Sequence, residues 1–543
     1  MKRYCFLSAI LLAFLFITFT ACGSTPSVTT ADTTNTTKPI ATTKEPPMST
    51  SPVTTTTPIT EKPKPTTVTI DKTFSLICSA SASNAEKVAA NRIVTSMSHF
   101  GVTLSVKNDN TPQTGNEILI GNTSRKESQS AIKSISAGGY SLSICENESS
   151  GVSLILAAID EDGFELATNH LIINYLSRDK NATLPFTLSV THIKADVTLQ
   201  EKYKLSDYTV VYAKEGTMSD VNIQSAKYAD AARDFAALVE KFTGHTLSVV
   251  PDTEDLSQYQ HVILFGNTAS LEDNIVYSAS FFKKGTKAYG VRTFNTGSIS
   301  LAGNNPISAY TAGEAFLAAI AENQNEITDL KLSGEKDIIH VACLGDSITY
   351  GTGAADPSMQ AYPVYFQRML GYNYYVEKYG LPSHSLIETD QPSYLKHDYF
   401  KKSAEAKPDV IIVMLGTNDT RPSRWADSAY KDWSDPARKQ AFLNAGNKLV
   451  ENYRQTNPDV QIIFATCPTV PQAADWTANL MKHGNPGINE IASANNCPVI
   501  DIFTYTKKHI EMFAGSDGLH LKDEKYEMLA QGFYELTKNI IKK

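Results

Sequence analysis

The sequence predicts an α/β protein in which a C-terminal three-layer domain, a parallel sheet flanked by helices, follows two tandem α+β units. Apolar strand-like runs alternate with helical patterns from residue 336 onward, which is typical of a parallel sheet buried on both faces. Ahead of it, one pattern of elements occurs twice. The chain of 543 residues also exceeds what one hydrophobic core usually organises, so several domains are expected.

The first 22 residues have the layout of an export signal. Basic Lys2 and Arg3 precede an apolar run over residues 6–19, and small residues lead to Cys22. This layout resembles a bacterial lipoprotein signal, which implies lipidation of Cys22 and a cell-surface, extracellular protein anchored to the membrane. An ordinary signal peptide cut nearby is the alternative. The run is shorter than the roughly 20 residues that a membrane span needs.

Residues 23–67 are dominated by Thr, Pro and Ser. Such a composition cannot bury a core and is typical of an extended linker. We expect it to be a disordered spacer.

Residues 68–200 and 201–335 are predicted to be two copies of one α+β unit. Gly121-Asn122-Thr123 follows an apolar strand in the first and recurs as Gly266-Asn267-Thr268 in the second. Each unit is expected to hold a strand, a helix, a short strand, the strand before this motif, a helix, a strand pair and a last helix. The long helices are expected over 84–99, 161–176, 221–242 and 307–322. Ser83 and Glu86 form a capping box for the first.

This unit is weakly similar to the N-terminal domains of some glycoside hydrolases, such as hexosaminidases and α-glucuronidases. The similarity rests on one short motif and on element order, so no functional residue is carried over. The glycines of the motif are expected to serve turns at strand ends.

Residues 336–543 alternate strands and helices. The expected strands are 338–344, 374–379, 409–415, 460–465 and 498–502, and the expected later helices are 437–455, 474–494 and 522–541. Ligands of such sheets bind beyond the carboxyl ends of the strands.

Three short motifs in this domain supply the parts of a nucleophilic hydrolase. Ser347 follows the first apolar strand, Asn418 follows a later one, and Asp517 stands three residues before His520. A serine hydroxyl needs an imidazole to take its proton and an acid to orient that imidazole. An oxyanion needs N–H donors already aimed at it. Turns explain each motif alone, but not their order and their placement at strand ends.

These motifs resemble the four blocks of the GDSL, or SGNH, hydrolases over roughly the last two hundred residues. The resemblance implies Ser347 as nucleophile, His520 as base and Asp517 as its acid. It implies an oxyanion hole made by the Ser347 and Gly380 amides and the Asn418 side chain. In the second block, Lys378 and Ser383 stand where the family commonly has Asn and a second Gly.

Net charge, metal-ligand spacing and cysteine content limit the partners, cofactors and disulfides that we expect. The net charge is −8 and no basic stripe occurs, which argues against a nucleic-acid partner. No metal-ligand spacing is found, so neither a metal nor another cofactor is expected. The cysteines after Cys22 lie in or beside apolar runs and are expected to be buried thiols. A disulfide between Cys78 and Cys145 is left open.

The predicted activity is that of an esterase removing O-acetyl groups from polysaccharide at the cell surface, or acting on another small ester. The residues around Ser347 and Asn418 look more like the carbohydrate deacetylases of the family than like its lipases. Trp425 and Asp346 are candidate substrate-binding residues, whereas Trp433 and Trp476 are expected to be packing residues. Two alternatives remain: a lysophospholipase or thioesterase of the same superfamily, and a surface carbohydrate-binding protein with an inert hydrolase domain.

Overall fold

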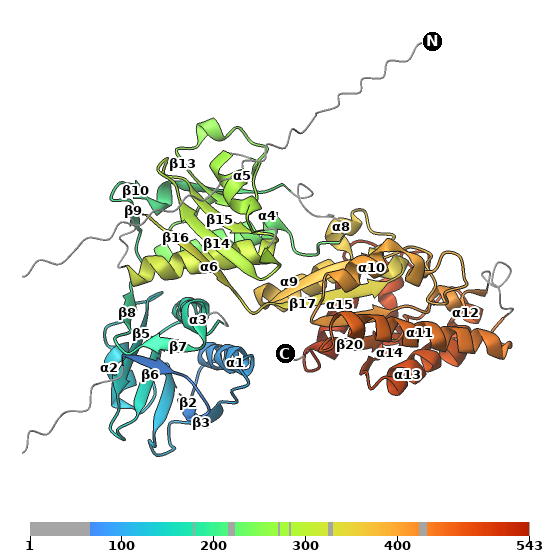
Figure 1. Cartoon of the computed structure of the whole chain (residues 1–543), viewed down its shortest axis with the longest axis horizontal. Helices are drawn as coiled ribbons and strands as arrows, with labels where there is room; N and C mark the ends of the chain where they lie inside the picture. Colours follow the sequence, from blue (N-terminus) through green and yellow to red (C-terminus); the bar gives the residue numbers. More distant parts are fainter. Residues whose placement is uncertain are drawn as a thin grey trace, which may run out of the picture. The chain divides into compact units, whose positions relative to one another are not determined.

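The computed structural model describes residues 66–541, except 178–179, 215–222, 270–271, 282–283, 324–328 and 423–431 (Figure 1). The predicted signal peptide, the lipidation site at Cys22, almost all of the spacer and Trp425 lie outside these residues. Among the described residues, no helix has both the length and the apolar character that crossing a membrane requires. All five described cysteines are free thiols, so the Cys78–Cys145 disulfide is not formed.

The first α+β unit is built on a mixed sheet with the strand order β3-β2-β4-β6-β5-β8. The first four strands are parallel, and β5 pairs antiparallel with both β6 and β8. Its elements are β1 (Thr67–Thr69), β2 (Phe74–Cys78), α1 (Asn84–Ser98), β3 (Ser105–Asn108), β4 (Asn116–Ile120), α2 (Lys126–Ile132), β5 (Tyr140–Glu146), β6 (Val152–Ala158), α3 (Glu161–Tyr175), β7 (Thr183–Pro185) and β8 (Ser189–His192). The capping box at Ser83 and Glu86 is present as predicted.

The second unit has a sheet of the same order and strand directions, β12-β11-β13-β15-β14-β16. Its elements, with the connection to it, are β9 (Thr198–Leu199), β10 (Tyr203–Lys204), β11 (Tyr208–Tyr212), α4 (Tyr228–Thr243), β12 (Ser248–Pro251), β13 (His261–Phe265), α5 (Glu272–Ala279), β14 (Ala288–Thr293), β15 (Ile299–Gly303), α6 (Pro306–Glu322) and β16 (Lys331–Glu335).

Helix α4 departs from the sequence prediction. The expected helix over 221–242 begins only at Tyr228. Before it, Gln224 forms an isolated antiparallel bridge with Glu377 of the C-terminal domain. This long-range backbone contact therefore overrides the local helical pattern here.

The C-terminal domain, yellow to red in Figure 1, has an all-parallel sheet of order β18-β17-β19-β20-β21. Helices α10, α11 and α13 pack on one face of the sheet, and α9 and α15 on the other. Its elements are β17 (Ile339–Gly345), α7 (Ser347–Tyr350), α8 (Pro357–Gln360), α9 (Tyr362–Leu370), β18 (Tyr374–Gly380), α10 (Asp398–Glu405), β19 (Val410–Met414), α11 (Pro436–Thr456), β20 (Gln461–Ala465), α12 (Ala474–Asn479), α13 (Asn485–Ala494), β21 (Val499–Ile500), α14 (Ile502–Lys508) and α15 (Lys525–Thr537).

This arrangement confirms the predicted α/β fold class with a three-layer C-terminal domain. The expected helix over 474–494 is divided by a π-helical segment into α12 and α13. The exact domain boundaries stay predictions.

Gly380 brings the edge strand β18 against the backbone of α7. A Cβ atom on Gly380 would lie 2.1 Å from the Tyr350 nitrogen and 2.5 Å from its Cα. Backbone atoms cannot rotate away as the end of a side chain can. We therefore expect Gly380→Ala to destabilise the fold by about 3 kcal/mol, the upper end of the usual cost of overpacking.

Thermal unfolding of Gly380→Ala beside Gly487→Ala checks this prediction. In the control, the nearest contact of the added carbon is the Phe442 ring at 3.0 Å, and alanine favours the helix interior. A melting temperature for Gly380→Ala as high as that of the control would contradict the close approach.

Candidate active site

The nucleophile candidate sits where β17 passes directly into α7. Asp346 caps this short helix, and its carboxylate accepts a hydrogen bond from the Ile348 N–H at 3.0 Å. A Cβ at Gly345 would lie 2.0 Å from the Thr349 hydroxyl oxygen, so the turn requires glycine. Ser347 therefore stands at the carboxyl edge of the sheet with 7% of its surface exposed.

His520 and Asp517 meet Ser347 across a sequence separation of 173 residues. The Ser347 Oγ lies 2.9 Å from His520 Nε2, and His520 Nδ1 lies 2.7 Å from an Asp517 carboxylate oxygen. The acceptor at Nδ1 favours a proton on that nitrogen, which leaves Nε2 to accept from the serine hydroxyl. The Ser–His–Asp relay predicted from the motifs is thus assembled in space.

The Asp517 carboxylate is also held by its own loop. The backbone N–H groups of Leu519 and His520 donate to its other oxygen at 2.9 and 2.7 Å. Burial raises the pKa of Asp517, but these bonds and the one from the His520 ring together hold the pKa below its ordinary value. The acid partner stays ionised and fixed.

Asn418 follows β19 and is 5% exposed. Its side-chain nitrogen donates to the His384 carbonyl at 3.0 Å. An amide carries two N–H groups, so this bond orients the side chain and leaves the second N–H for another acceptor. Ser347 itself begins α7, and the first N–H groups of a helix lack intrahelical partners.

Gly380, whose amide is a predicted oxyanion donor, is the last residue of β18. Alternate residues of a strand point their N–H groups to opposite edges. The Leu381 N–H bonds to the Gly345 carbonyl of β17, whereas the Lys378 N–H points to the other edge and bonds to Ile223. Gly380 shares the direction of Lys378, away from β17. The role of Gly380 as an oxyanion donor stays a prediction.

Two buried groups that the motifs did not single out hold the loop after β18. The Asp419 carboxylate accepts from the N–H groups of Leu386 and Ile387 at 3.0 and 2.8 Å. The fully buried Arg438 donates to the Asp419 carbonyl at 2.7 Å and to the Asp390 carboxylate at 3.1 Å. Only folding reveals this network, because no short spacing connects its members.

Neither Asp346 nor the described tryptophans face a substrate surface. Asp346 is 1% exposed and caps α7, so the structure places it beneath the nucleophile rather than in contact with a ligand. Trp433 and Trp476 are buried, as expected for packing residues, and donate to the carbonyls of Asp419 and Thr417 beside Asn418. Among the described residues, no cluster of three or more His, Cys, Asp or Glu side chains could hold a metal ion.

Comparison with known protein families gives a match to the GDSL-like lipase/acylhydrolase family over residues 343–528. This range includes the β17–α7 turn, Asn418 and the Asp517–His520 pair. These residues form a GDSL-like hydrolase domain. The resemblance drawn from the motifs is confirmed.

An acetylxylan esterase of Xylanibacter ruminicola is 35% identical over 91 residues, which is 17% of this chain. The match spans only 19% of that esterase. Solved structures similar to the GDSL domain include a GDSL-like lipase from Parabacteroides merdae, described as putative, with 15% identity and a TM-score of 0.31. It covers 37% of this chain and 97% of its own. A family two carbohydrate esterase from Clostridium thermocellum has 18% identity and a TM-score of 0.29, over 39% and 66% of the two chains.

The buried Asp346 carboxyl makes the stability of the GDSL domain depend on pH. Burial raises its pKa from 3.8 to about 6, against the opposing hydrogen bond from Ile348. The folded state then holds a proton that the unfolded state releases, so this group favours folding at low pH. That contribution falls as the pH rises from about 4 to about 6, by on the order of 3 kcal/mol.

Asp346→Asn keeps the capping oxygen but cannot ionise. We expect the melting temperature of wild type relative to this variant to fall between pH 4 and pH 7, as measured by circular dichroism. Asp419, whose pKa burial also raises to about 6, titrates in both proteins and cancels in the comparison. Melting curves that stay parallel across this range would contradict a protonated Asp346.

Proposed function

We propose that this protein is a serine esterase that removes O-acetyl groups from polysaccharide through an acyl-enzyme on Ser347. The observation that carries the proposal is the hydrogen-bonded series from Ser347 to His520 to Asp517, with contacts of 2.9 and 2.7 Å. Similarity to an acetylxylan esterase over 91 residues favours an acetylated polysaccharide as substrate.

The chemistry follows from the positions of these groups. His520 takes the Ser347 proton as Oγ attacks the ester carbonyl, and it then returns the proton to the leaving sugar hydroxyl. Asn418 and the Ser347 amide supply N–H groups to the oxyanion. Water activated by His520 then releases acetate and restores the serine.

We further propose that the protein acts outside the cell while tethered by lipid at Cys22. The basic start, the apolar run and the position of Cys22 support this proposal. Labelling with radioactive palmitate tests it: label is expected on wild type and absent from Cys22→Ala, and a labelled Cys22→Ala protein would contradict it.

We also propose that the two α+β units arose by duplication. The shared strand order, the shared strand directions and the repeated Gly-Asn-Thr motif support this origin.

Acetate release from acetylated xylan and other acetylated polysaccharides, beside esters of long acyl chains, tests the proposed activity. Ser347→Ala is expected to lower acetate release by several orders of magnitude, while the matched control Ser493→Ala, at an exposed position on α13, keeps the wild-type rate. Faster cleavage of long-chain esters than of acetylated polysaccharide would contradict the proposed substrate. Equal rates for wild type and Ser347→Ala would contradict the nucleophile.

Asn418→Ala is expected to reduce kcat for p-nitrophenyl acetate by about 10²- to 10³-fold, because one oxyanion donor is lost. Asn418→Asp keeps the shape of the side chain but removes both N–H groups, so it is expected to be equally impaired. A kcat within twofold of wild type for either variant would remove Asn418 from the oxyanion hole.

A further inference from the structure

A short segment of the second α+β unit, residues 223–225, forms an isolated antiparallel β-bridge with the edge strand β18 of the GDSL domain. The Lys378 N–H donates to the Ile223 carbonyl at 2.7 Å, and the Ser225 N–H donates to the Val376 carbonyl at 3.1 Å. Gln224, between them, is 3% exposed. These bonds satisfy backbone groups on the outer edge of β18, which an edge strand otherwise leaves open.

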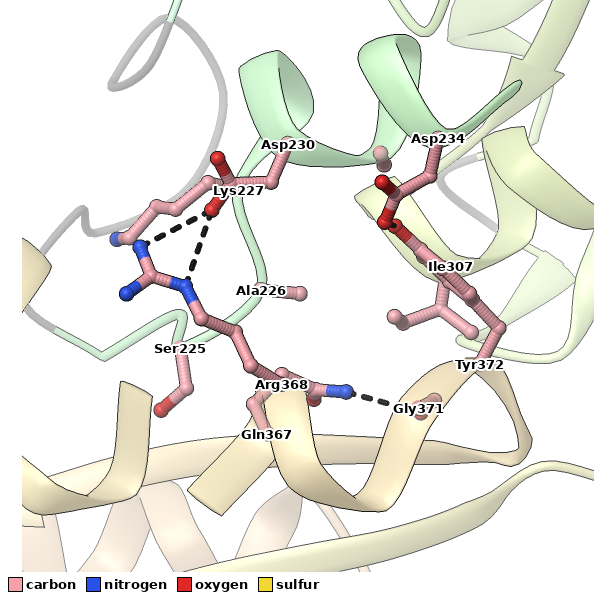
Figure 2. Close-up of a pocket in the computed structure, with 11 residues that line it drawn as sticks. Ser225, Ala226, Lys227, Asp230, Asp234, Ile307, Gln367, Arg368, Gly371 and Tyr372 are labelled. Carbon is pink, nitrogen blue, oxygen red and sulfur yellow. Dashed lines mark hydrogen bonds and ion pairs between the residues drawn. The ribbon is translucent and has the colours of Figure 1, made fainter. Parts of the chain in front are cut away.

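Side chains also hold the interface between the second α+β unit and the GDSL domain (Figure 2). Arg368 of α9 pairs with Asp230 of α4 at 3.1 Å, and the Tyr372 hydroxyl donates to Asp234. These groups line a small cavity of about 90 Å³. The side chain of Lys227 donates to the Gln224 carbonyl at 2.8 Å and so holds the bridging segment within its own unit.

Lys378, whose N–H bonds to Ile223, has a buried side chain that is 1% exposed. Its ammonium donates to the Tyr350 carbonyl at 3.0 Å and to the Pro357 carbonyl at 2.6 Å. Tyr350 ends α7, the helix that Ser347 begins, and a cation is favourable at the negative end of a helix. A buried ammonium requires such partners.

The two carbonyls bound by Lys378 mark the ends of the loop 351–356, and this loop packs against the base. A Cβ at Gly353 would lie 2.4 Å from the Leu521 carbonyl oxygen and 3.2 Å from His520 Cβ. The Tyr526 hydroxyl donates to the Thr352 carbonyl at 2.7 Å, and the Ala355 N–H donates to Asp523 at 2.8 Å. One ammonium therefore joins the helix of Ser347 to the loop that supports His520.

We propose that Lys378 is a positioning residue that fixes the distance between Ser347 and His520, and that the bridging segment 223–225 of the second α+β unit holds Lys378 in place. This proposal rests on the proposed function, because it takes Ser347 as the nucleophile. The second α+β unit then helps to hold the active-site geometry, rather than acting as a separate module.

Lys378→Met in the full chain removes the two hydrogen bonds but keeps the apolar stem. We expect kcat for p-nitrophenyl acetate to fall by about 10²-fold with KM unchanged within twofold, since a misplacement near 1 Å has an effect of that size. The rate at which a fluorophosphonate modifies Ser347 is expected to fall by the same factor. Lys378→Gln, which retains a donor, is expected to lie between Lys378→Met and wild type.

Lys336→Met is the matched control. Lys336 is also buried and pairs with Glu314 of α6 at 2.7 Å, so its loss destabilises the protein without touching the loop 351–356. We expect a lower melting temperature and an unchanged kcat per folded molecule. A purely structural role of Lys378 would give the same result for Lys378→Met and would overturn the proposal.

The kinetics of these variants distinguish a failure of the positioning role from a failure of the proposed function. A kcat within twofold of wild type for folded Lys378→Met, or a raised KM at unchanged kcat, overturns the positioning role. If Lys378→Met does not fold, Lys378→Gln decides by the same criteria. When these variants match wild type while Ser347→Ala is inactive, only the positioning role fails; when Ser347→Ala is active, the proposed function itself fails.

Discussion

The hydrogen bond between Ser347 Oγ and His520 Nε2 is the contact on which the proposed chemistry of this protein depends, because it joins residues 173 positions apart at 2.9 Å. A serine hydroxyl without a base is a weak nucleophile at neutral pH. Two close approaches set the position of the serine: Gly345 allows β17 to turn directly into α7, and Gly380 allows β18 to lie against the end of that helix. On the other side, the loop 351–356 packs against His520 and is tied to the chain that follows it.

Buried charge organises the rest of the site. Asp346 caps the nucleophile helix, and Asp419 holds the loop after β18 through two backbone N–H groups. Desolvation raises the pKa of both carboxyls to about 6, so their hydrogen bonds only partly offset the cost of burial. Arg438 and Lys378 place buried cations nearby. Lys378 donates to two backbone carbonyls, and Arg438 donates to the Asp419 carbonyl and the Asp390 carboxylate. Buried polar groups therefore maintain the geometry of the candidate site, and removing one of them is expected to destabilise the fold.

The sequence predicted the chemistry well because the reactive side chains stand at the ends of apolar strands. Ser347 and Asn418 follow such strands, and parallel strands bring their carboxyl ends to one edge of a sheet. Asp517 and His520 are close enough in sequence to meet in one loop. These residues could be placed from local pattern and from the shared order of the motifs.

Other features depend on contacts that no local pattern encodes. The direction of the Gly380 N–H depends on the alternation of N–H groups along β18, which a sequence motif does not determine. The helical pattern over 221–242 is real in periodicity, yet Gln224 within it bridges to Glu377 of β18 instead. In the sequence, Arg438 and Lys378 look like ordinary exposed charges, and only the folded structure shows that they are buried. Sequence reasoning fails here because tertiary pairing and desolvation decide the outcome.

Reaction of the full chain with a fluorophosphonate, followed by mass spectrometry of the peptides, tests whether Ser347 is the nucleophile and His520 its base. We expect a single adduct per molecule on Ser347, and modification slowed by orders of magnitude in His520→Ala. An adduct on another residue, or a His520→Ala protein modified at the wild-type rate, would contradict it.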